Sequence, residues 1–312
     1  MVLAAAALWG TTGTAQSLAD GQLTAGWFGA LRLVVATAFF ALYAWATHRK
    51  SAFDPVHGPL PWSGVVGAGI CMAVYNLAFF AGVRLTGVGL GTAIALGSGP
   101  LWAGMLQALV SRQLPSVRWW MGTVAAVGGG AMMALSSSGA GQTVSLTGIA
   151  LCLAAGLSYA VYTLLNKTLV RHASAASITL RAFGVAALLA LPAAWIEGGT
   201  PSLVASDYWA VAYVGVVTAG VAYLLFSQAL RHISAATGVT LALGEPVVAF
   251  TLAVLVLGEQ PGAMAFAGLM LVIAGVLVVV RAELRSAREA PTAQSARMAA
   301  LTSSPSSSTD IA

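Results

Sequence analysis

Long apolar stretches separated by short polar connectors make up most of this chain. Each stretch has about 20 residues, the length that an α-helix needs to cross the hydrocarbon core of a bilayer. The connectors contain Gly, Pro, Asp and Ser, which favour turns. The pattern predicts ten spanning helices, at residues 2–19, 25–47, 60–83, 88–110, 117–135, 146–166, 174–196, 208–230, 235–257 and 262–281.

The composition supports a membrane protein without a large soluble domain. Of the 312 residues, 59% are hydrophobic and 7% are charged, whereas an ordinary soluble protein has about 25% charged residues. We therefore predict an all-α, polytopic protein embedded in the lipid bilayer. Cys71 and Cys152 fall within apolar stretches and are expected to be packing residues. The basic residues behind the net charge of +5 are scattered, so we expect no nucleic-acid partner.

Lysines and arginines concentrate in alternate connectors. Among the basic residues of the other connectors we find only Arg84. Cytoplasmic loops of membrane proteins carry an excess of Lys and Arg. The bias predicts a multi-pass protein of the cytoplasmic (inner) cell membrane with both termini in the cytoplasm. The residues of the basic connectors are Arg49, Lys50, Arg112, Arg118, Lys167, Arg171 and Arg231, with Arg281, Arg285, Arg288 and Arg297 in the tail.

The two ends of the chain differ in character. The apolar run from Met1 to Ala19 has no basic residue before it, which favours a spanning helix over a cleaved signal peptide. This start is also consistent with a native chain that begins a few residues earlier. Residues 282–312 are rich in Ala and Ser, bury too little apolar surface to order themselves, and are predicted to be a disordered cytoplasmic tail.

The chain repeats itself. A shift of 146 residues places Pro100 on Pro246, Pro115 on Pro261, and two glycines on two others, Gly122 on Gly268 and Gly129 on Gly275. Five predicted helices in each half is an odd number, so the second half enters the membrane with the opposite orientation. The sequence therefore predicts an inverted-topology repeat, as in many secondary transporters, with halves at residues 1–136 and 146–281.

Each half contains one apolar stretch with glycine and proline in its middle. These are residues 95–100, Ala-Leu-Gly-Ser-Gly-Pro, and residues 242–246, Ala-Leu-Gly-Glu-Pro. Proline removes a backbone donor, so Pro100 and Pro246 are expected to break their helices. Two interrupted segments in matching places point to a transporter binding site. We expect a mid-membrane cavity there, reached by Asn76, Ser98, Tyr223 and Glu245.

Several motifs together resemble the EamA family of the drug/metabolite transporter superfamily, over residues 1 to about 281. They are Leu8-Trp9-Gly10, Leu31-Arg32-Leu33, Leu180-Arg181-Ala182, Pro100, Glu245-Pro246 and Leu257-Gly258-Glu259. The first repeat departs from the pattern, with Ser111-Arg112-Gln113 where the second has Leu257-Gly258-Glu259.

The resemblance implies two EamA repeats of five helices that export small metabolites, often amino acids or related compounds, by alternating access. It implies a cavity lined by helices 1, 3, 4, 6, 8 and 9 and an ion gradient as the energy source. The chain has no phosphate-binding loop. We expect a small-molecule substrate, no cofactor, no ATPase subunit, and a monomer or homodimer.

Glu245 is the acid that the pattern places deep within a span. A lone ionised carboxylate at that depth is costly, so an intramembrane Glu by default marks a functional site. One interpretation is a coupling residue that binds a proton or a substrate amine. The other is a structural carboxyl that accepts hydrogen bonds from backbone donors near Pro246.

Polar and aromatic residues recur on the helices that the resemblance places at the cavity. Taken singly, such residues serve hydrogen bonds between helices, but as a set they favour a polar, aromatic-lined cavity. Tyr159, Tyr162 and Asn166 share one helix face. The candidate substrate-binding residues are Thr12, Gln16, Tyr75, Asn76, Ser98, Tyr159, Tyr162, Asn166, Tyr223, Ser227 and Gln228.

Two arginines, Arg32 and Arg181, lie about two turns inside their helices, and a shift of 149 residues, close to that of the repeat, places one on the other. As a pair they would suit anionic substrates. We favour a structural role, because a long side chain near a helix end can extend to the interface and because the resemblance places neither helix at the cavity.

Two other classes of function stay open. An intramembrane serine hydrolase could use Ser98, but His48, His57, His172 and His232 all lie at predicted helix ends, and no metal-binding spacing occurs. A non-transporting scaffold would instead direct its polar residues at other helices. We expect a transporter, not an enzyme.

Overall fold

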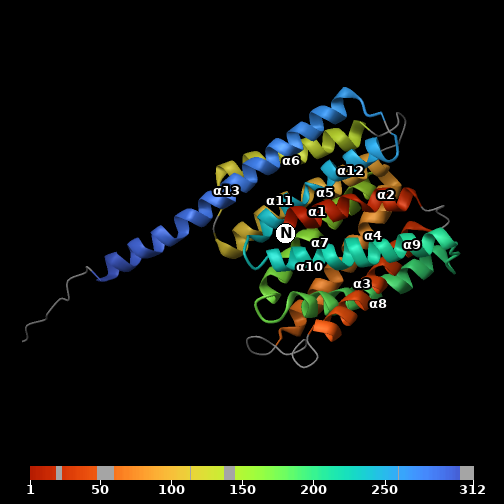
Figure 1. The fold of residues 1–312 in the computed structure, drawn as a ribbon, viewed down its shortest axis with the longest axis horizontal. Coiled ribbons are helices and arrows are strands. Elements are labelled where there is room, and N and C mark those ends of the chain that lie inside the picture. The colour runs from red at the N-terminus through yellow and green to blue at the C-terminus, as the bar shows by residue number, and fades with distance from the viewer. Residues whose placement is uncertain (19–22, 48–59, 113, 137–144, 259, 303–312) are drawn as a thin grey trace, which may run out of the picture.

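The computed structural model describes residues 1–18, 23–47, 60–112, 114–136, 145–258 and 260–302. All regular secondary structure in these ranges is helical (Figure 1). The first half contains α1 (Val2–Gly10), α2 (Thr12–Ser17), α3 (Ala25–Thr47), α4 (Trp62–Thr86), α5 (Val88–Ser111) and α6 (Val117–Ser136). The second half contains α7 (Leu146–Leu169), α8 (Ala175–Gly198), α9 (Ala205–Tyr213), the π-helix η1 (Val214–Val221), α10 (Ala222–Ala229), α11 (Ala235–Ala242), α12 (Glu245–Leu255) and α13 (Ala263–Thr302).

Eight helical segments in the described part of the chain are long and apolar enough to cross a membrane. The chain is therefore an all-helical, polytopic membrane protein. Two of the ten predicted spans fall outside this group. The first is interrupted at Thr11, so α1 and α2 are each short. The other is α6, in which Arg118 and several glycines dilute the hydropathy.

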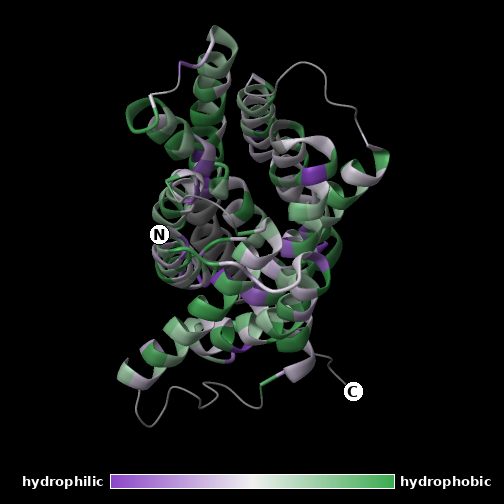
Figure 2. Cartoon of the chain, turned by 90° about the vertical axis from the view of Figure 1, so that its right-hand side faces the viewer, coloured by the Kyte–Doolittle hydropathy of each residue, from purple (hydrophilic) through white to green (hydrophobic). Residues whose placement is uncertain are grey.

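The surface and the core of the bundle differ in the size of their side chains. Large apolar residues face outward, and Leu109, Leu146, Ile196 and Trp209 are all more than three-quarters exposed. Figure 2 shows that hydrophobic residues dominate the helices, with hydrophilic positions in short stretches. The core is largely alanine. Small core residues let helices approach closely, which drives helix association in lipid, where exposed apolar surface costs little.

The two halves meet through helices that are counterparts in the sequence repeat. Helix α3 packs against α8, and α6 packs against α13. In the second pair the contacts run through the repeated glycines. A Cβ on Gly122 would lie 2.7 Å from the carbonyl oxygen of Gly275, and one on Gly129 would lie 2.5 Å from that of Gly268. Gly122 thus contacts the repeat counterpart of Gly129, and Gly129 contacts that of Gly122.

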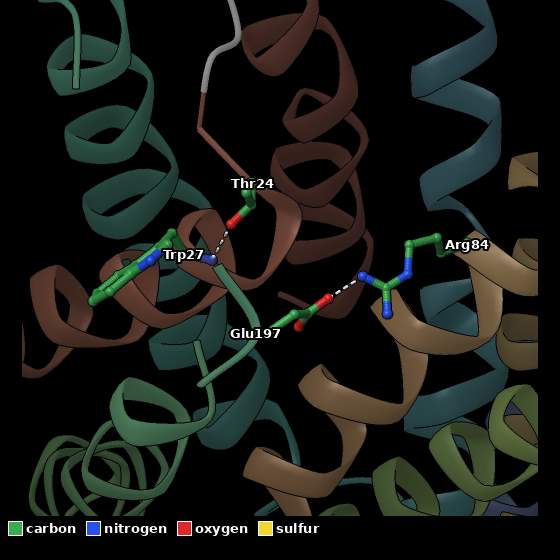
Figure 3. A network of polar contacts seen from close by, with 4 residues as sticks. All are labelled: Thr24, Trp27, Arg84 and Glu197. Carbon is green, nitrogen blue, oxygen red and sulfur yellow. Dashed lines mark hydrogen bonds and ion pairs between the residues drawn. The ribbon is translucent and has the colours of Figure 1, made fainter. Parts of the chain in front are cut away.

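A polar clasp joins α3, α4 and α8 at one end of the bundle (Figure 3). Arg84 and Glu197 form an ion pair. Beside this ion pair, the indole N–H of Trp27 donates to the carbonyl oxygen of Gly199 at 2.9 Å. The backbone N–H of Trp27 donates to Thr24 Oγ1 at 3.4 Å. Both members of the ion pair are partly exposed. Such exposed ion pairs contribute about 1 kcal/mol or less to the free energy of unfolding. The clasp therefore serves more to position the ends of α3, α4 and α8 than to stabilise the fold.

Helix α13 continues beyond the point where the sequence predicts that order ends. It runs to Thr302 and projects from the bundle (Figure 1), whereas a disordered tail was expected from residue 282. A helix that is already nucleated extends at little cost through residues of good helix propensity, and this segment is rich in Ala. Residues 303–312 lie outside the described part of the chain.

The glycine contacts predict a matched pair of variants. Gly129→Ala places a Cβ against the backbone of α13, 2.6 Å from the amide nitrogen of Val272. We expect it to lower the free energy of unfolding by about 1–3 kcal/mol, as for overpacked cores. Gly130→Ala meets nothing within 4 Å and should leave stability unchanged or slightly raised. Thermal unfolding of the purified variants in detergent checks this, and equal melting temperatures would contradict the glycine interface.

Candidate functional site

Three helix interruptions of the described chain meet at one level of the bundle. The first lies between α1 and α2 at Thr11, the second is η1, and the third separates α11 from α12 just before Pro246. The indole of Trp9 donates to the carbonyl oxygen of Thr218, inside η1, at 2.8 Å. A Cβ on Gly10 would lie 2.7 Å from the carbonyl oxygen of Glu245. Helix α1 therefore packs against both other interruptions.

Pro100 does not interrupt its helix, in contrast to the prediction. Helix α5 runs from Val88 to Ser111 with Pro100 inside it, fully buried. Proline removes a single backbone hydrogen bond here, and the helix continues through this position. At Pro246 the chain leaves the helix at Leu243 and Gly244 and starts a new one, with Pro246 in the first turn.

Four tyrosines from three helices form a cluster beside these interruptions. This tyrosine cluster consists of Tyr75 on α4, Tyr159 and Tyr162 on α7, and Tyr223 on α10. Their ring centroids lie 5.2 Å apart for Tyr75 and Tyr159, 6.2 Å for Tyr159 and Tyr162, and 6.1 Å for Tyr162 and Tyr223. Trp9 contacts Tyr223 edge-on at 5.0 Å. The cluster brings aromatic rings and hydroxyl groups of three helices together.

Glu245 and Arg32 bring opposite charges to the tyrosine cluster. Glu245 is half-buried in the first turn of α12, and its charge acts on Tyr75, Tyr159 and Tyr223. The charge of Arg32 acts on Glu245. In the described part of the chain, however, the oppositely charged side chains whose nitrogen and oxygen atoms come within 4.0 Å are those of Arg84 and Glu197. Arg32 and Glu245 therefore share one region of low polarity without direct contact.

The side chain of Arg32 does not extend in the direction that we expected from its place near a helix end. Its guanidinium does not extend to an interface but donates to Asn76 Oδ1 at 3.1 Å. Two more donors in this contact, Arg32 Nε and Asn76 Nδ2, are buried without a hydrogen-bond partner in the described structure. Its repeat counterpart Arg181 behaves as predicted, since it bonds to Ser177 and lies over the ring of the exposed Trp62.

A glycine one turn before Arg32 explains the difference between the two arginines. A Cβ on Gly29 would lie 2.8 Å from Asn76 Oδ1 and 2.6 Å from the ring of Phe80. Gly29 thus brings α3 against α4, and Arg32, three residues later, lies on the same helix face. The residue three positions before Arg181 is Ile178, which is bulky and buried. This spacing was the signal in the sequence that we missed.

A second polar group makes hydrogen bonds between helices, although Asn166 Oδ1 is buried without a partner in the described structure. Asn166 donates to Ser227 Oγ at 2.8 Å and to the hydroxyl of Tyr162 at 3.3 Å, and Ser227 also contacts Thr179 at 3.3 Å. These contacts link α7, α8 and α10. Interhelical hydrogen bonds of this kind contribute about 0.6 kcal/mol each in membrane proteins. Tyr162, Asn166 and Ser227 are therefore better explained as helix-joining residues than as ligand contacts.

The remaining candidate residues lie apart from the tyrosine cluster. Thr12 and Gln16 are on α2, and Gln16 is exposed. Ser98 donates to the carbonyl oxygen of Ala95 at 3.3 Å and lies against Gly156 of α7. Gln228 is half-buried near the end of α10. No described contact joins any of these four to Glu245.

The described cavities lie towards the two ends of the bundle rather than at the tyrosine cluster. The larger, of about 810 Å³, lies between α5, α6, α7, α11 and α13, at the end that carries Lys167, Arg171 and Glu283. The smaller, of about 560 Å³, is lined by Thr11, Trp209, Tyr213 and Leu252 at the opposite end. Neither cavity is lined by Asn76, Ser98, Tyr223 or Glu245, the residues that we expected around a mid-membrane cavity.

Comparison with known proteins identifies close similarity to a group of transporters. A sequence profile of the EamA-like transporter family matches residues 1–135 and 146–281. The chain is 33% identical to the uncharacterized transporter YwfM of Bacillus subtilis (strain 168), over 95% of this chain and 97% of that protein. It is 30% identical to a probable terminal-alkyne amino-acid exporter of Streptantibioticus cattleyicolor, over 55% of this chain and 57% of that one.

The fold also has a counterpart among solved structures. One crystal structure superposes with a TM-score of 0.77 over 91% of this chain and 96% of its own. The two sequences are 19% identical, so the likeness establishes the fold and nothing further.

The hydrogen bonds around Ser227 predict a small and local loss of stability. Ser227→Ala removes the acceptor of Asn166 and should lower the free energy of unfolding by about 0.5–1.5 kcal/mol. Gln228→Ala, at the next position, changes a side chain with no described polar contact and should have an effect within about 0.5 kcal/mol. Denaturation of both purified variants measures this, and a neutral Ser227→Ala would show that the contacts do not join the helices.

Proposed function

The chain belongs to the EamA-like transporter family, and we propose that it is a secondary transporter that exports small metabolites such as amino acids or related compounds. The observation that carries this proposal is Glu245, an acid at a helix interruption beside the tyrosine cluster. The relative from Streptantibioticus cattleyicolor is described as a probable amino-acid exporter, which supports this substrate class.

The proposed architecture has ten spanning segments in two inverted halves. The crossed contacts of Gly122 with Gly275 and of Gly129 with Gly268 support it, since a two-fold axis in the membrane plane generates such a pair. The pairing of α3 with α8 also fits this axis. In this arrangement α1 and α2 together form the first span and α6 forms the fifth. The second half begins at α7 and inserts with the opposite orientation.

The proposed orientation places the basic end of the bundle in the cytoplasm. Lys167, Arg171 and Arg231 lie at that end, and the excess of basic residues in its connectors supports the assignment. The larger cavity then opens to the cytoplasm, and the cavity at Trp209 and Tyr213 opens to the outside. The polar clasp of Arg84 and Glu197 lies at the outer end.

Alternating access in this scheme uses the interrupted helices as hinges. The breaks at Thr11, in η1 and before Pro246 contact one another through Trp9 and Gly10. Helices α4, α5 and α7, which face them from the other side, are continuous. Relative motion of the interrupted helices against the continuous ones would expose the tyrosine cluster to each cavity in turn. Hinge residues of this kind absorb the backbone change of a moving segment.

Glu245 is the proposed coupling group. It faces Arg32 from α3, Tyr75 from α4, Tyr159 from α7 and Tyr223 from α10. An isolated ionised carboxylate is costly in this environment, so it needs either a proton or a cationic partner. A substrate ammonium group and a proton would compete for the one carboxylate. Binding of substrate from the cytoplasm would then release a proton, and return of a proton from outside would release substrate.

This coupling predicts the behaviour of Glu245→Gln. The glutamine imitates the protonated acid and lacks the charge that pairs with a substrate ammonium group, so the variant should lose most exchange of radiolabelled substrate across proteoliposome membranes. It should also lose the accumulation of that substrate driven by a pH gradient. Glu197→Gln, which alters an exposed acid at the outer end, should retain both activities.

The outcome separates coupling from structure. If Glu245→Gln still concentrates substrate against a gradient as the wild type does, Glu245 is a structural carboxyl and the coupling scheme is wrong. A correctly folded protein is verified in both variants by gel filtration in detergent.

A further inference from the structure

The contact between Arg32 and Asn76 leaves two buried donors without an acceptor. The acceptor atom of the Asn76 amide is occupied, because its Oδ1 receives the bond from Arg32. The Nδ2 group of Asn76 and the Nε group of Arg32 are buried without partners in the described structure. Asn76 itself is 2% exposed. A buried donor without an acceptor is costly, so native structures provide a partner for it or hold it ready for a ligand.

We propose that Arg32 and Asn76 form a carboxylate subsite, and that the site selects substrates that carry both a carboxylate and an amino group. The inference rests on the proposed function and adds to it that Arg32 binds the negatively charged carboxylate of the substrate. A carboxylate offers only acceptors, and its planar shape suits the guanidinium group. The two unpartnered donors and the charge of Arg32 together match that chemistry.

The opposite charge of Glu245 restricts the substrate further. Arg32 and Glu245 lie in the same region but are not in contact. A ligand with a single charge would pair with one of them and leave the other buried without a partner, which is strongly unfavourable. A ligand with both charges pairs with both residues. The arrangement therefore discriminates against simple amines and simple carboxylic acids.

The tyrosine cluster supplies the rest of the site. The rings of Tyr75 and Tyr159 contact each other at a tilt of 40°, and Tyr223 packs edge-on against Trp9. Such aromatic faces favour an apolar or unsaturated side chain, with which they make dispersion contacts. The geometry thus points to amino acids with apolar side chains as the preferred members of the class.

The repeat provides a matched control for Arg32. Arg181 occupies the equivalent place in the second half, but it bonds to Ser177 and lies over Trp62. If arginine at this position served only the packing of its helix, Arg32→Gln and Arg181→Gln would have similar effects. A carboxylate subsite predicts that only Arg32→Gln changes which ligands are preferred.

The experiment measures binding by the purified full-length chain in detergent. The standard L-amino acids are screened by thermal shift, because a ligand of the folded state raises its melting temperature. The amino acid with the largest effect is then compared by calorimetry with its own amide, which lacks the carboxylate, and with its deaminated acid. The wild type should bind the amino acid at least about tenfold more tightly than either analogue, as expected for charge-assisted hydrogen bonds.

The variants identify the residue that is responsible. Arg32→Gln should bind the amino acid and its amide within about twofold of each other, whereas Arg181→Gln should keep the wild-type ratio. A loss of helix packing would weaken both ligands equally, so the ratio reports the subsite itself. Arg32→Lys keeps the charge without the planar fork and should give an intermediate ratio. It provides the measurement if Arg32→Gln does not fold.

Each result has one meaning. A wild type that binds the amide as tightly as the amino acid overturns the subsite and leaves the export of amino-acid derivatives in place. If Arg32→Gln and Arg32→Lys both keep the wild-type ratio of affinities for the amino acid and its amide, Arg32 does not bind the carboxylate. Absence of a thermal shift with every amino acid overturns the proposed substrate class, and the subsite with it.

Discussion

A backbone that leaves the helix inside a membrane must find hydrogen-bond partners within the protein, and this requirement organises the centre of the structure. The chain meets it by bringing three interruptions together. The indole of Trp9 reaches a carbonyl oxygen of η1, and Gly10 allows α1 to approach the start of α12. Because these contacts hold the break before Pro246 in place, Glu245 lies near Tyr75, Tyr159 and Tyr223 instead of in lipid. Arg32 and Asn76 also have donors that the described protein does not use.

The periphery follows a different rule, that of close packing between small residues. Gly122, Gly129, Gly268 and Gly275 bring the backbones of α6 and α13 together. The packing is tight enough that a methyl group would clash, so this pair is a rigid frame. The interrupted helices α1, η1 and α12 lack comparable regularity, although α12 contacts α13 through the rings of Phe250 and Phe266. A rigid frame and an interrupted core are what a protein needs if one part is to move against another.

Much of this structure could be predicted from the sequence, because its signals are local. Apolar length located the helices, and Pro246 located the interruption of the ninth apolar stretch. The features that we did not predict depend on contacts with neighbouring helices. Pro100 sits in the same motif as Pro246, yet α5 continues through it. The π-helix has no signal that we recognised in a run of Val, Gly, Thr and Ala. Arg32 and Arg181 look alike in sequence, and only the approach of α3 at Gly29 separates them.

The central claim is that the carboxylate of Glu245 holds either a proton or the substrate. The most direct test is the number of protons released when an amino acid binds to the purified wild type. It is obtained by calorimetry in two buffers with different ionisation enthalpies, from weakly acidic to weakly alkaline pH. The account predicts proton release on binding over part of this range, up to one proton for each bound molecule. Binding without proton release at every pH would contradict it.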